Sequence, residues 1–472
     1  MCNGVLSQIQ VAGAGAGKTY SLAEKILDRY ETKNNFKNIY ALTYTNYAKK
    51  NIISRIMEIN NGYIPNDISI ETVHSFLLNE IIYPFNKLYF GTTYYRATSI
   101  QLSDKISLQK YQLNRLNQKG IIHNIQVFNK AKQMIVCRKG ETKKLCEKKK
   151  LIVDYLVSSI DALFIDEAQD LDNDALSLFG ELGKNIYLYM VGDSKQAIKY
   201  PNAFNEFVNK VPSNNYEILP VNTITRRIPE RHLRVSNLFC SIGEQQTTIS
   251  RVLGKIFYVY FTDKMFEKVY KLYLKQEALI YIRQENDNFS TKNGRIKFEL
   301  EESIRQKILE KTSPAYDSDA YIKSLESCFI NITKNKGAKA AINSFTKRFD
   351  ITLDNNEYAR LINDLNIDEK KKKLKCMSID KVKGLERDLC MFIVDNTMLE
   401  YLFGIKKEIN KESKRLYVAL TRSKRDLILV IDESLMTDKK KEYIDIKFKE
   451  MNIPYLNSEY IESIASDDKG KL

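Results

Sequence analysis

The 472-residue sequence contains no tryptophan, no paired-cysteine motif and no long apolar run. A membrane-spanning helix needs about 18 consecutive apolar residues, and no stretch reaches this length, so no membrane span is expected. The first residues lack the basic and apolar segments of a secretory signal, so we expect a cytoplasmic protein. The seven cysteines are scattered and form no CxxC pair, which argues against a disulfide framework, a zinc ribbon or an iron–sulfur cluster.

The composition is that of a basic globular protein. Lysine and arginine number 74 against 59 acidic residues, which gives a formal net charge of +15. A basic surface attracts polyanions, so nucleic acid is a reasonable partner, although solvated surface lysines would give the same balance. Hydrophobic residues make up 43% of the chain. Its length suffices for about two to four domains, each with its own core.

The stretch VAGAGAGKTY (11–20) is typical of a phosphate-binding loop. Residues 8–12 predict a short strand, and the apolar residues of 20–30 recur at helical spacing. A strand, a glycine loop and a helix are the context in which such a loop binds phosphates at a helix N-terminus; a glycine-rich turn with an idle lysine is the alternative. Lys18 would reach the β- and γ-phosphates, and the Thr19 hydroxyl would bind Mg²⁺. The residues of this loop expected to bind ATP are Ala12, Gly13, Ala14, Gly15, Ala16, Gly17, Lys18 and Thr19.

The stretch DALFIDEAQD (161–170) provides an acidic pair after an apolar run. The run predicts a buried parallel strand, and open α/β sheets bind ligands at the carboxyl ends of such strands. Asp166 would hold Mg²⁺ through water, and Glu167 would orient or deprotonate the attacking water. An exposed acidic loop is the alternative, but the phosphate-binding loop favours the catalytic interpretation.

The DEAQD motif resembles the signature of the UvrD/Rep/PcrA helicases of superfamily 1A. ALTYTNYAKKNIISRI (41–56) and ETVHSF (71–76) resemble two further segments of that family, which contact single-stranded DNA. The resemblance implies that Tyr44 stacks on a base, which suits a motor that reads any sequence. A tyrosine packed in the sheet and a capping or core histidine are the alternatives for Tyr44 and His74. The residues of these segments expected to contact DNA are Thr43, Tyr44, Asn46, Thr72 and His74.

YLYMVGDSKQAIKYPNAF (187–204) resembles the family's VGDxxQ element. The resemblance implies that Gln196 senses the γ-phosphate. The arginine–glycine pair usual in the family is absent, and residues 199–202 replace it. Because the chain lacks tryptophan, Tyr200 is the expected substitute for stacking on a base.

Three later segments match the family in the expected order: residues 219–239, 378–388 and 414–429. Their resemblance implies that Arg227 and Arg422 reach the γ-phosphate across a cleft. Arg226 stands where the family has a tyrosine that stacks on adenine, and a guanidinium plane can also stack on a base. The matches imply further ATP contacts for Gly384 and Glu386, the latter as the ribose-binding acid. The glutamine that reads adenine upstream of the phosphate-binding loop has no counterpart.

The resemblance implies an α/β protein with two RecA-like P-loop domains, each interrupted by a mainly helical insertion. The first domain would comprise residues 1–88 and 151–217, and the second residues 218–295 and 370–455. The remaining segments would be a basic insertion (89–150), a reduced second insertion (296–369) and a polar C-terminal tail (456–472).

We therefore expect an ATP- and Mg²⁺-dependent DNA translocase or helicase that acts on single-stranded or tailed DNA. The family resemblance implies 3′-to-5′ movement. Within the family, the chain is most similar to the helicase subunit of the Gabija antiphage defence system, which implies a nuclease subunit as partner in a hetero-oligomeric complex. A nucleic-acid-sensing regulatory ATPase with little unwinding and a stand-alone DNA repair helicase are the alternatives.

Overall fold

The computed structural model divides into two compact units, Met1–Leu279 with Ile379–Leu472 and Ile280–Ser378. The boundaries expected at 295/296 and 369/370 lie outside the residues that it describes. In the described part of the chain, no helix is both long and apolar enough to cross a membrane. The described residues are 7–103, 105–291, 300–312, 318–365, 373–432 and 437–469.

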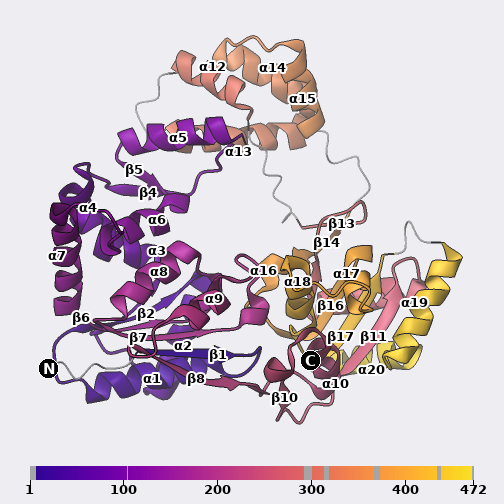
Figure 1. Ribbon diagram of the computed structural model, residues 1–472. Helices are drawn as coiled ribbons and strands as arrows, with labels where there is room; N and C mark the ends of the chain where they lie inside the picture. The colour runs from indigo at the N-terminus through magenta and orange to yellow at the C-terminus, as the bar shows by residue number, and fades with distance from the viewer. Residues whose placement is uncertain are drawn as a thin grey trace. The chain divides into compact units, whose positions relative to one another are not determined.

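The first unit contains a six-stranded sheet (Figure 1). Its strands have the order β3-β2-β6-β7-β1-β8, and all neighbouring strands run parallel. Every residue of β6 is buried, which confirms the strand expected from the apolar run before Asp166. Such a strand is covered on both faces, as parallel sheets usually are. The strands are β1 (Ser7–Ala12), β2 (Asn38–Thr43), β3 (Ile68–Thr72), β6 (Ile160–Ile165), β7 (Tyr187–Gly192) and β8 (Tyr216–Asn222).

Two apolar clusters cover the two faces of this sheet. Leu163 and Ile165 of β6 belong to one cluster, and Ala162 and Phe164 belong to the other, because successive side chains of a strand point to opposite faces. Helices α1 (Lys18–Thr32) and α2 (Asn46–Ile59) supply the second cluster, and α8 (Asn173–Leu182) supplies the first. The buried residues of α1 are those of the expected helical stripe: Leu22, Ala23, Ile26 and Leu27.

The segment between β3 and β6 is mainly helical. Its α7 runs unbroken through residue 150, where the sequence suggested the end of the insertion. A short parallel pair of strands interrupts the helices. The elements are α3 (Val73–Phe76), the π-helix η1 (Leu77–Ile82), α4 (Tyr83–Phe90), β4 (Arg96–Thr98), α5 (Ile106–Gln118), β5 (Ile121–His123), α6 (Asn124–Ile135) and α7 (Lys143–Ser159).

Short elements and α9 complete the first half of this unit, which ends with β8 at residue 222, and lead into the second half, residues 223–279 and 379–469. Helices η2 and η3 each follow a strand of the sheet at its carboxyl end, and β9 pairs in parallel with β10. The elements are η2 (Ala168–Asp170), η3 (Ser194–Gln196), α9 (Ala203–Lys210), β9 (Ile224–Thr225), α10 (Glu230–Ser236), η4 (Asn237–Phe239), η5 (Ile242–Glu244) and β10 (Thr247–Thr248).

The second half of the first unit contains the parallel strands β11, β17 and β16. The segment expected to be a polar tail instead forms a packed helix, α20. Its Tyr460 hydroxyl lies 2.7 Å from the Tyr273 hydroxyl, and both side chains are buried, as is Ile464. The elements are β11 (Lys255–Tyr260), α11 (Lys264–Lys275), α16 (Ile379–Val382), β16 (Arg387–Val394), α17 (Asn396–Leu402), α18 (Lys411–Leu420), β17 (Ser423–Ile431), α19 (Asp438–Glu450) and α20 (Ser458–Lys469).

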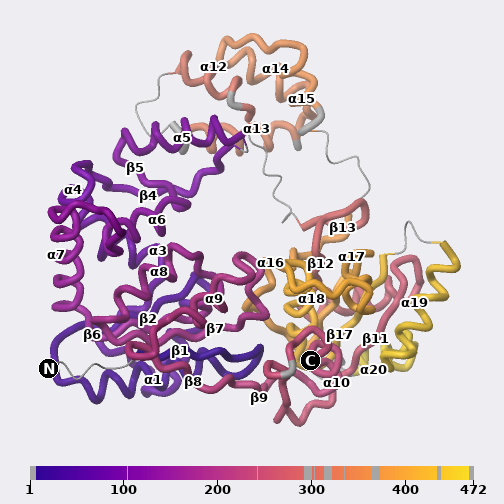
Figure 2. The backbone as a smooth tube through the Cα atoms, in the orientation of Figure 1, coloured from indigo at the N-terminus to yellow at the C-terminus, as the bar shows by residue number. Residues whose placement is uncertain are grey.

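The second unit is built on a small helical core (Figure 2). Leu300, Ile304 and Ile308, which stand at helical spacing in the sequence, are all buried in it. Two short parallel strand pairs, β12 with β15 and β13 with β14, accompany the helices. The elements are β12 (Leu279–Ile282), β13 (Phe289–Ser290), α12 (Glu302–Thr312), α13 (Ser318–Lys336), α14 (Ala338–Phe349), α15 (Asn355–Leu365), β14 (Leu374–Lys375) and β15 (Met377–Ser378).

Candidate functional site

A cavity of about 870 Å³ lies within the first unit, and both halves of that unit contribute to its walls. Segments that follow β1, β2 and β6 form one side, which is where parallel sheets place their ligands. The sequence-predicted residues that line the cavity are Gly15, Ala16, Gly17, Lys18, Thr19, Thr43, Tyr44, Asp166, Glu167, Gln196, Arg227, Gly384, Glu386 and Arg422. Those that do not line it are Ala12, Gly13, Ala14, Asn46, Thr72, His74, Tyr200 and Arg226.

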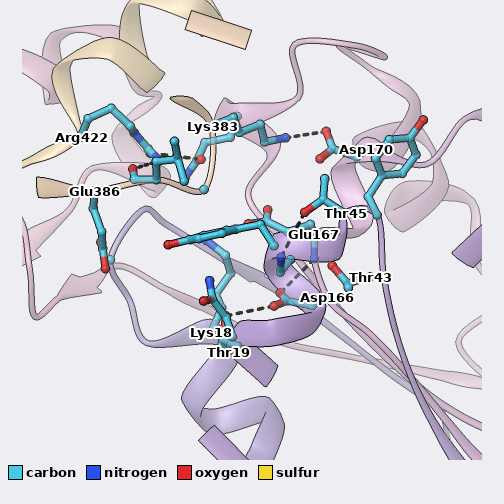
Figure 3. A pocket seen from close by; sticks show the side chains of 18 of the residues that line it. Lys18, Thr19, Thr43, Thr45, Asp166, Glu167, Asp170, Lys383, Glu386 and Arg422 are labelled. Atoms are coloured by element: carbon cyan, nitrogen blue, oxygen red, sulfur yellow. Dashed lines mark hydrogen bonds and ion pairs between the residues drawn. The ribbon is translucent and has the colours of Figure 1, made fainter. Parts of the chain in front are cut away.

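The loop before α1 brings Lys18 and Thr19 to the floor of the cavity (Figure 3). The Lys18 ammonium donates to the backbone carbonyls of Ala12 at 3.3 Å and Gly13 at 3.1 Å. The Thr19 hydroxyl donates to a carboxylate oxygen of Asp166 at 3.0 Å. A hydroxyl beside a carboxylate is the hard oxygen donor set that Mg²⁺ prefers, so these two side chains fit the expected cation.

The two acids after β6 have pKa values shifted in opposite directions. Burial and the neighbouring Glu167 carboxylate raise the pKa of Asp166 to about 6. Burial alone would raise the pKa of Glu167, but the ammonium groups of Lys383 and Lys18 bring it below its ordinary value. The backbone of Glu167 has a φ of 55°, a left-handed conformation that costs a non-glycine residue about 1–3 kcal/mol. Glu167 is therefore an ionised carboxylate on a strained backbone, a combination that is common at functional sites.

A chain of polar contacts connects Glu167 with Arg422 across the site. The Gln169 amide donates to Glu167, and its oxygen accepts from the Asp193 N–H at 2.9 Å. The Asp193 carboxylate accepts from the Gln196 amide at 2.8 Å. The Gln196 oxygen in turn accepts from Nη2 of Arg422 at 3.2 Å. Because each group is fixed by the next, the expected base, sensor and arginine share one network.

Arg227 approaches the phosphate-binding loop from the second half of the unit. It donates to the Glu386 carboxylate and, from Nη2, to the Thr421 carbonyl at 3.2 Å. Burial alone would raise the pKa of Glu386, but the charge of Arg227 lowers it. At Gly15, where φ is +69°, a Cβ atom would come within 2.5 Å of the Thr225 hydroxyl and 2.9 Å of Cβ of Arg227. Glycine is required there because the two segments approach so closely.

A different ion pair joins the two halves at the DEAQD motif. The Lys383 ammonium lies 2.5 Å from the Asp170 carboxylate, and each side chain is 13% exposed (Figure 3). Burial raises the pKa of Asp170, and the charge of Lys383 opposes that rise. The last acid of the motif therefore holds a cation from the opposite side of the cavity.

Three of the side chains expected to bind DNA gather around Lys199. Its ammonium lies 4.5 Å from the centre of the Tyr44 ring and 5.8 Å from that of Tyr200, and it donates to the Tyr44 hydroxyl. Tyr44 also contacts His74, with 5.7 Å between ring centres, and His74 packs against Phe128 at 4.5 Å. Burial, followed by the charge of Lys199, lowers the pKa of His74. The cluster thus contains one cation among four aromatic rings.

The other three expected DNA contacts occupy different environments. Thr43 is fully buried at the end of β2, and its hydroxyl has no hydrogen-bond partner among the described residues. Asn46 is exposed at the first position of α2. The Thr72 side chain accepts from the Ser75 N–H at 3.2 Å and so caps α3.

Several residues of the site were not predicted from the sequence. Gln169 lies inside the DEAQD motif, but its bridging role depends on where the chain places Asp193. Lys199 replaces a residue of the family pattern, and only the fold shows that it covers Tyr44. Gln246 lies in a segment without periodicity or motif, yet its side chain reaches the phosphate-binding loop, as its 3.0 Å contact with Ala14 shows.

The family model of an AAA domain matches residues 7–201, which include five of the six strands of the first sheet and the segment between β3 and β6. The Gabija protein GajB of Bacillus cereus (strain VD045) is 27% identical over an alignment of 511 positions, gaps included, which covers 94% of this chain and 95% of that protein.

Among solved structures, a chain from the complex of Arterivirus nonstructural protein 10 (helicase) with DNA is 10% identical, with a TM-score of 0.36. The match covers 90% of this chain, which spans 60% of that one. At this level the likeness is weak, and the parallel sheets described above define the mixed α/β fold. The chain is thus similar to an AAA domain over residues 7–201 and to a Gabija protein over 94% of its length.

Proposed function

We propose that the chain is an ATP-dependent DNA translocase or helicase whose ATP site is the cavity in the first unit. The observation that carries this proposal is the polar network from Glu167 through Gln196 to Arg422, because it joins a base, a sensor and a cation from both halves of the unit. Hydrolysis at such a two-sided site depends on how closely the halves approach, which is the physical basis of a motor.

Each group has a distinct role in this proposal. The loop N–H groups and Lys18 bind the phosphates at the N-terminus of α1. Glu167 orients and deprotonates the attacking water, and Gln196 senses the γ-phosphate. Arg227 and Arg422 stabilise the charge that develops on the transferred group. Thr19 and Asp166 would hold Mg²⁺, which neutralises phosphate charge when it is bound.

Base contacts are proposed at the residues around Lys199. Tyr44 and Tyr200 offer ring faces, and a base–aromatic stack is tolerant of sequence. The lysine ammonium beside them can pair with a backbone phosphate. A strand bound at this cluster would move as the cavity opens and closes. Movement in the 3′-to-5′ direction, a cytoplasmic location and a single-stranded or tailed DNA substrate complete the proposal.

The biological role proposed here is antiphage defence with a nuclease subunit as partner. Its support is the likeness to a Gabija protein along 94% of the chain. The motor would supply ATP-driven movement, and cutting would fall to the partner.

A second candidate, a regulatory ATPase that senses nucleic acid but unwinds little, is favoured by one observation. Lys199 covers one face of Tyr44, so a base must displace the lysine or stack elsewhere. Strand displacement on a 3′-tailed duplex separates the two candidates. Robust displacement by the isolated chain would eliminate the regulatory one.

The main proposal is tested by ATP hydrolysis with and without a single-stranded oligonucleotide, with Lys18→Ala as the blank. We expect strong stimulation by DNA in the wild type and none in the variant. Hydrolysis that is absent, or that ignores DNA, would contradict a DNA-driven motor in the isolated chain. Repeating the assay with the nuclease subunit then tests whether the partner completes it.

A further inference from the structure

Behind the phosphate-binding loop, away from the cavity, two buried side chains of the second half hold one residue of the loop, Ala14. Gln246 is 3% exposed and Tyr417 is 1% exposed. The Gln246 amide nitrogen donates to the Ala14 carbonyl at 3.0 Å, and its oxygen accepts from the Tyr417 hydroxyl at 2.6 Å. The Ala14 N–H donates to the same hydroxyl at 3.4 Å. Both polar groups of Ala14 are thus bound from the opposite half.

Chemistry fixes the orientation of this pair. A carbonyl can only accept, so the amide nitrogen of Gln246 must face Ala14 and the amide oxygen must face Tyr417. Burial raises the pKa of Tyr417 well above its ordinary value, so the hydroxyl keeps the proton that it donates. The Gln246 backbone is anchored by the Asn237 side chain, through bonds of 2.9 Å and 2.8 Å.

The loop sequence accommodates this contact. A Cβ atom at Gly13 would lie 2.4 Å from both the Cδ and Nε2 atoms of Gln246. No side chain fits in that space, so glycine at position 13 permits the glutamine to pack on the loop. Neither Gln246 nor Tyr417 lines the cavity. They support the back of the loop, whereas Arg227 and Arg422 approach its ligand side.

We propose that Gln246 and Tyr417 are positioning residues that hold the loop ready for phosphate only while the second half is docked against it. The inference rests on the proposed ATPase function and adds a second route of coupling, through the loop backbone rather than through the arginines. A loop held in this way binds substrate and transition state alike. Its loss should therefore raise KM for ATP more than it lowers kcat.

Gln246→Glu is the sharpest test, because it preserves shape but places a carboxylate oxygen against the Ala14 carbonyl. The neighbouring Gln245 is exposed, so Gln245→Glu is a matched control of equal charge. We expect Gln246→Glu to raise KM for ATP roughly tenfold or more and to change kcat by less than about threefold. The control should match the wild type. Binding of a fluorescent ATP analogue without DNA should weaken by a similar factor.

Tyr417→Phe gives an independent readout, since it removes only the hydroxyl. We expect Tyr417→Phe to raise KM roughly threefold or more, which is a smaller increase than that of Gln246→Glu. A double variant that combines Tyr417→Phe with Gln246→Ala should show a KM effect that differs from the sum of the two single effects, because the two side chains contact each other. A melting temperature for each variant shows whether it is folded, and Tyr417→Phe decides the matter if Gln246→Glu does not fold. Wild-type KM in the folded variants, or a fall in kcat alone, would overturn the inference. A wild type without DNA-stimulated hydrolysis would instead overturn the proposed function.

Discussion

Replacement of Arg422 by alanine tests the two-sided site most directly. The guanidinium is 1% exposed and donates to the Gln196 oxygen at 3.2 Å and to the Val418 carbonyl at 2.9 Å. In the proposed reaction it acts on charge that develops at the transferred phosphoryl group, so its effect belongs mainly to the transition state. An arginine in this role contributes roughly 10³–10⁵ in turnover. Arg422→Ala should lower kcat by that order and leave ATP affinity within roughly tenfold.

The same contacts predict a cost in stability that must be measured separately. Truncation leaves the Gln196 oxygen without its donor, and a buried acceptor left unpaired costs about 1–3 kcal/mol, whereas the Val418 carbonyl keeps its bonds from Thr421. Arg422→Lys retains the charge but loses the planar fork that reaches both acceptors, so its turnover should lie between those of alanine and wild type. The assay is steady-state hydrolysis with saturating DNA, beside binding of a fluorescent ATP analogue and a thermal melt. Turnover within twofold of wild type in a folded Arg422→Ala variant would refute the assignment.

Two further predictions concern other parts of the first unit. Tyr44→Ala should weaken single-stranded DNA binding by roughly 5- to 150-fold in fluorescence anisotropy, because a stacked base contributes about 1–3 kcal/mol. Tyr44→Phe keeps the ring, so its affinity should stay within about threefold of the wild type. Equal losses in both variants would assign the effect to the hydroxyl and its Lys199 contact. Burial lowers the pKa of His232 from 6.5 to about 4, so the unfolded chain binds the proton more tightly and stability falls as pH drops through 6.5 towards 4. The free energy of unfolding should fall by about 2 kcal/mol at pH 5 because of this group. In urea-unfolding measurements, His232→Gln should make the free energy of unfolding depend less on pH in this range, and an unchanged dependence would contradict the prediction.

The elements of the site that depend on local pattern could be predicted, and those that depend on distant packing could not. The buried run before Asp166 and the helical stripe after Lys18 are local signals, and the structure has both. Gln246 gave no such signal, because its importance comes from a contact with a residue 232 positions away. The tail helix was missed because its polar residues dominate the composition, while only Tyr460 and a few apolar neighbours anchor it.

The charged groups of the cavity already have protein partners, which constrains how a nucleotide could enter. Lys18 is bound to backbone carbonyls of its own loop, Thr19 to Asp166, and Arg227 to Glu386. If Arg227 is to contact a phosphate and Glu386 a ribose, their ion pair must open. Nucleotide binding would therefore replace existing contacts between protein groups with contacts to the nucleotide. Part of the ATP binding energy is then used to break contacts that join segments of the second half. Nucleotide binding and rearrangement of that half would therefore be coupled through charge, while Gln246 and Tyr417 would couple them through the loop backbone.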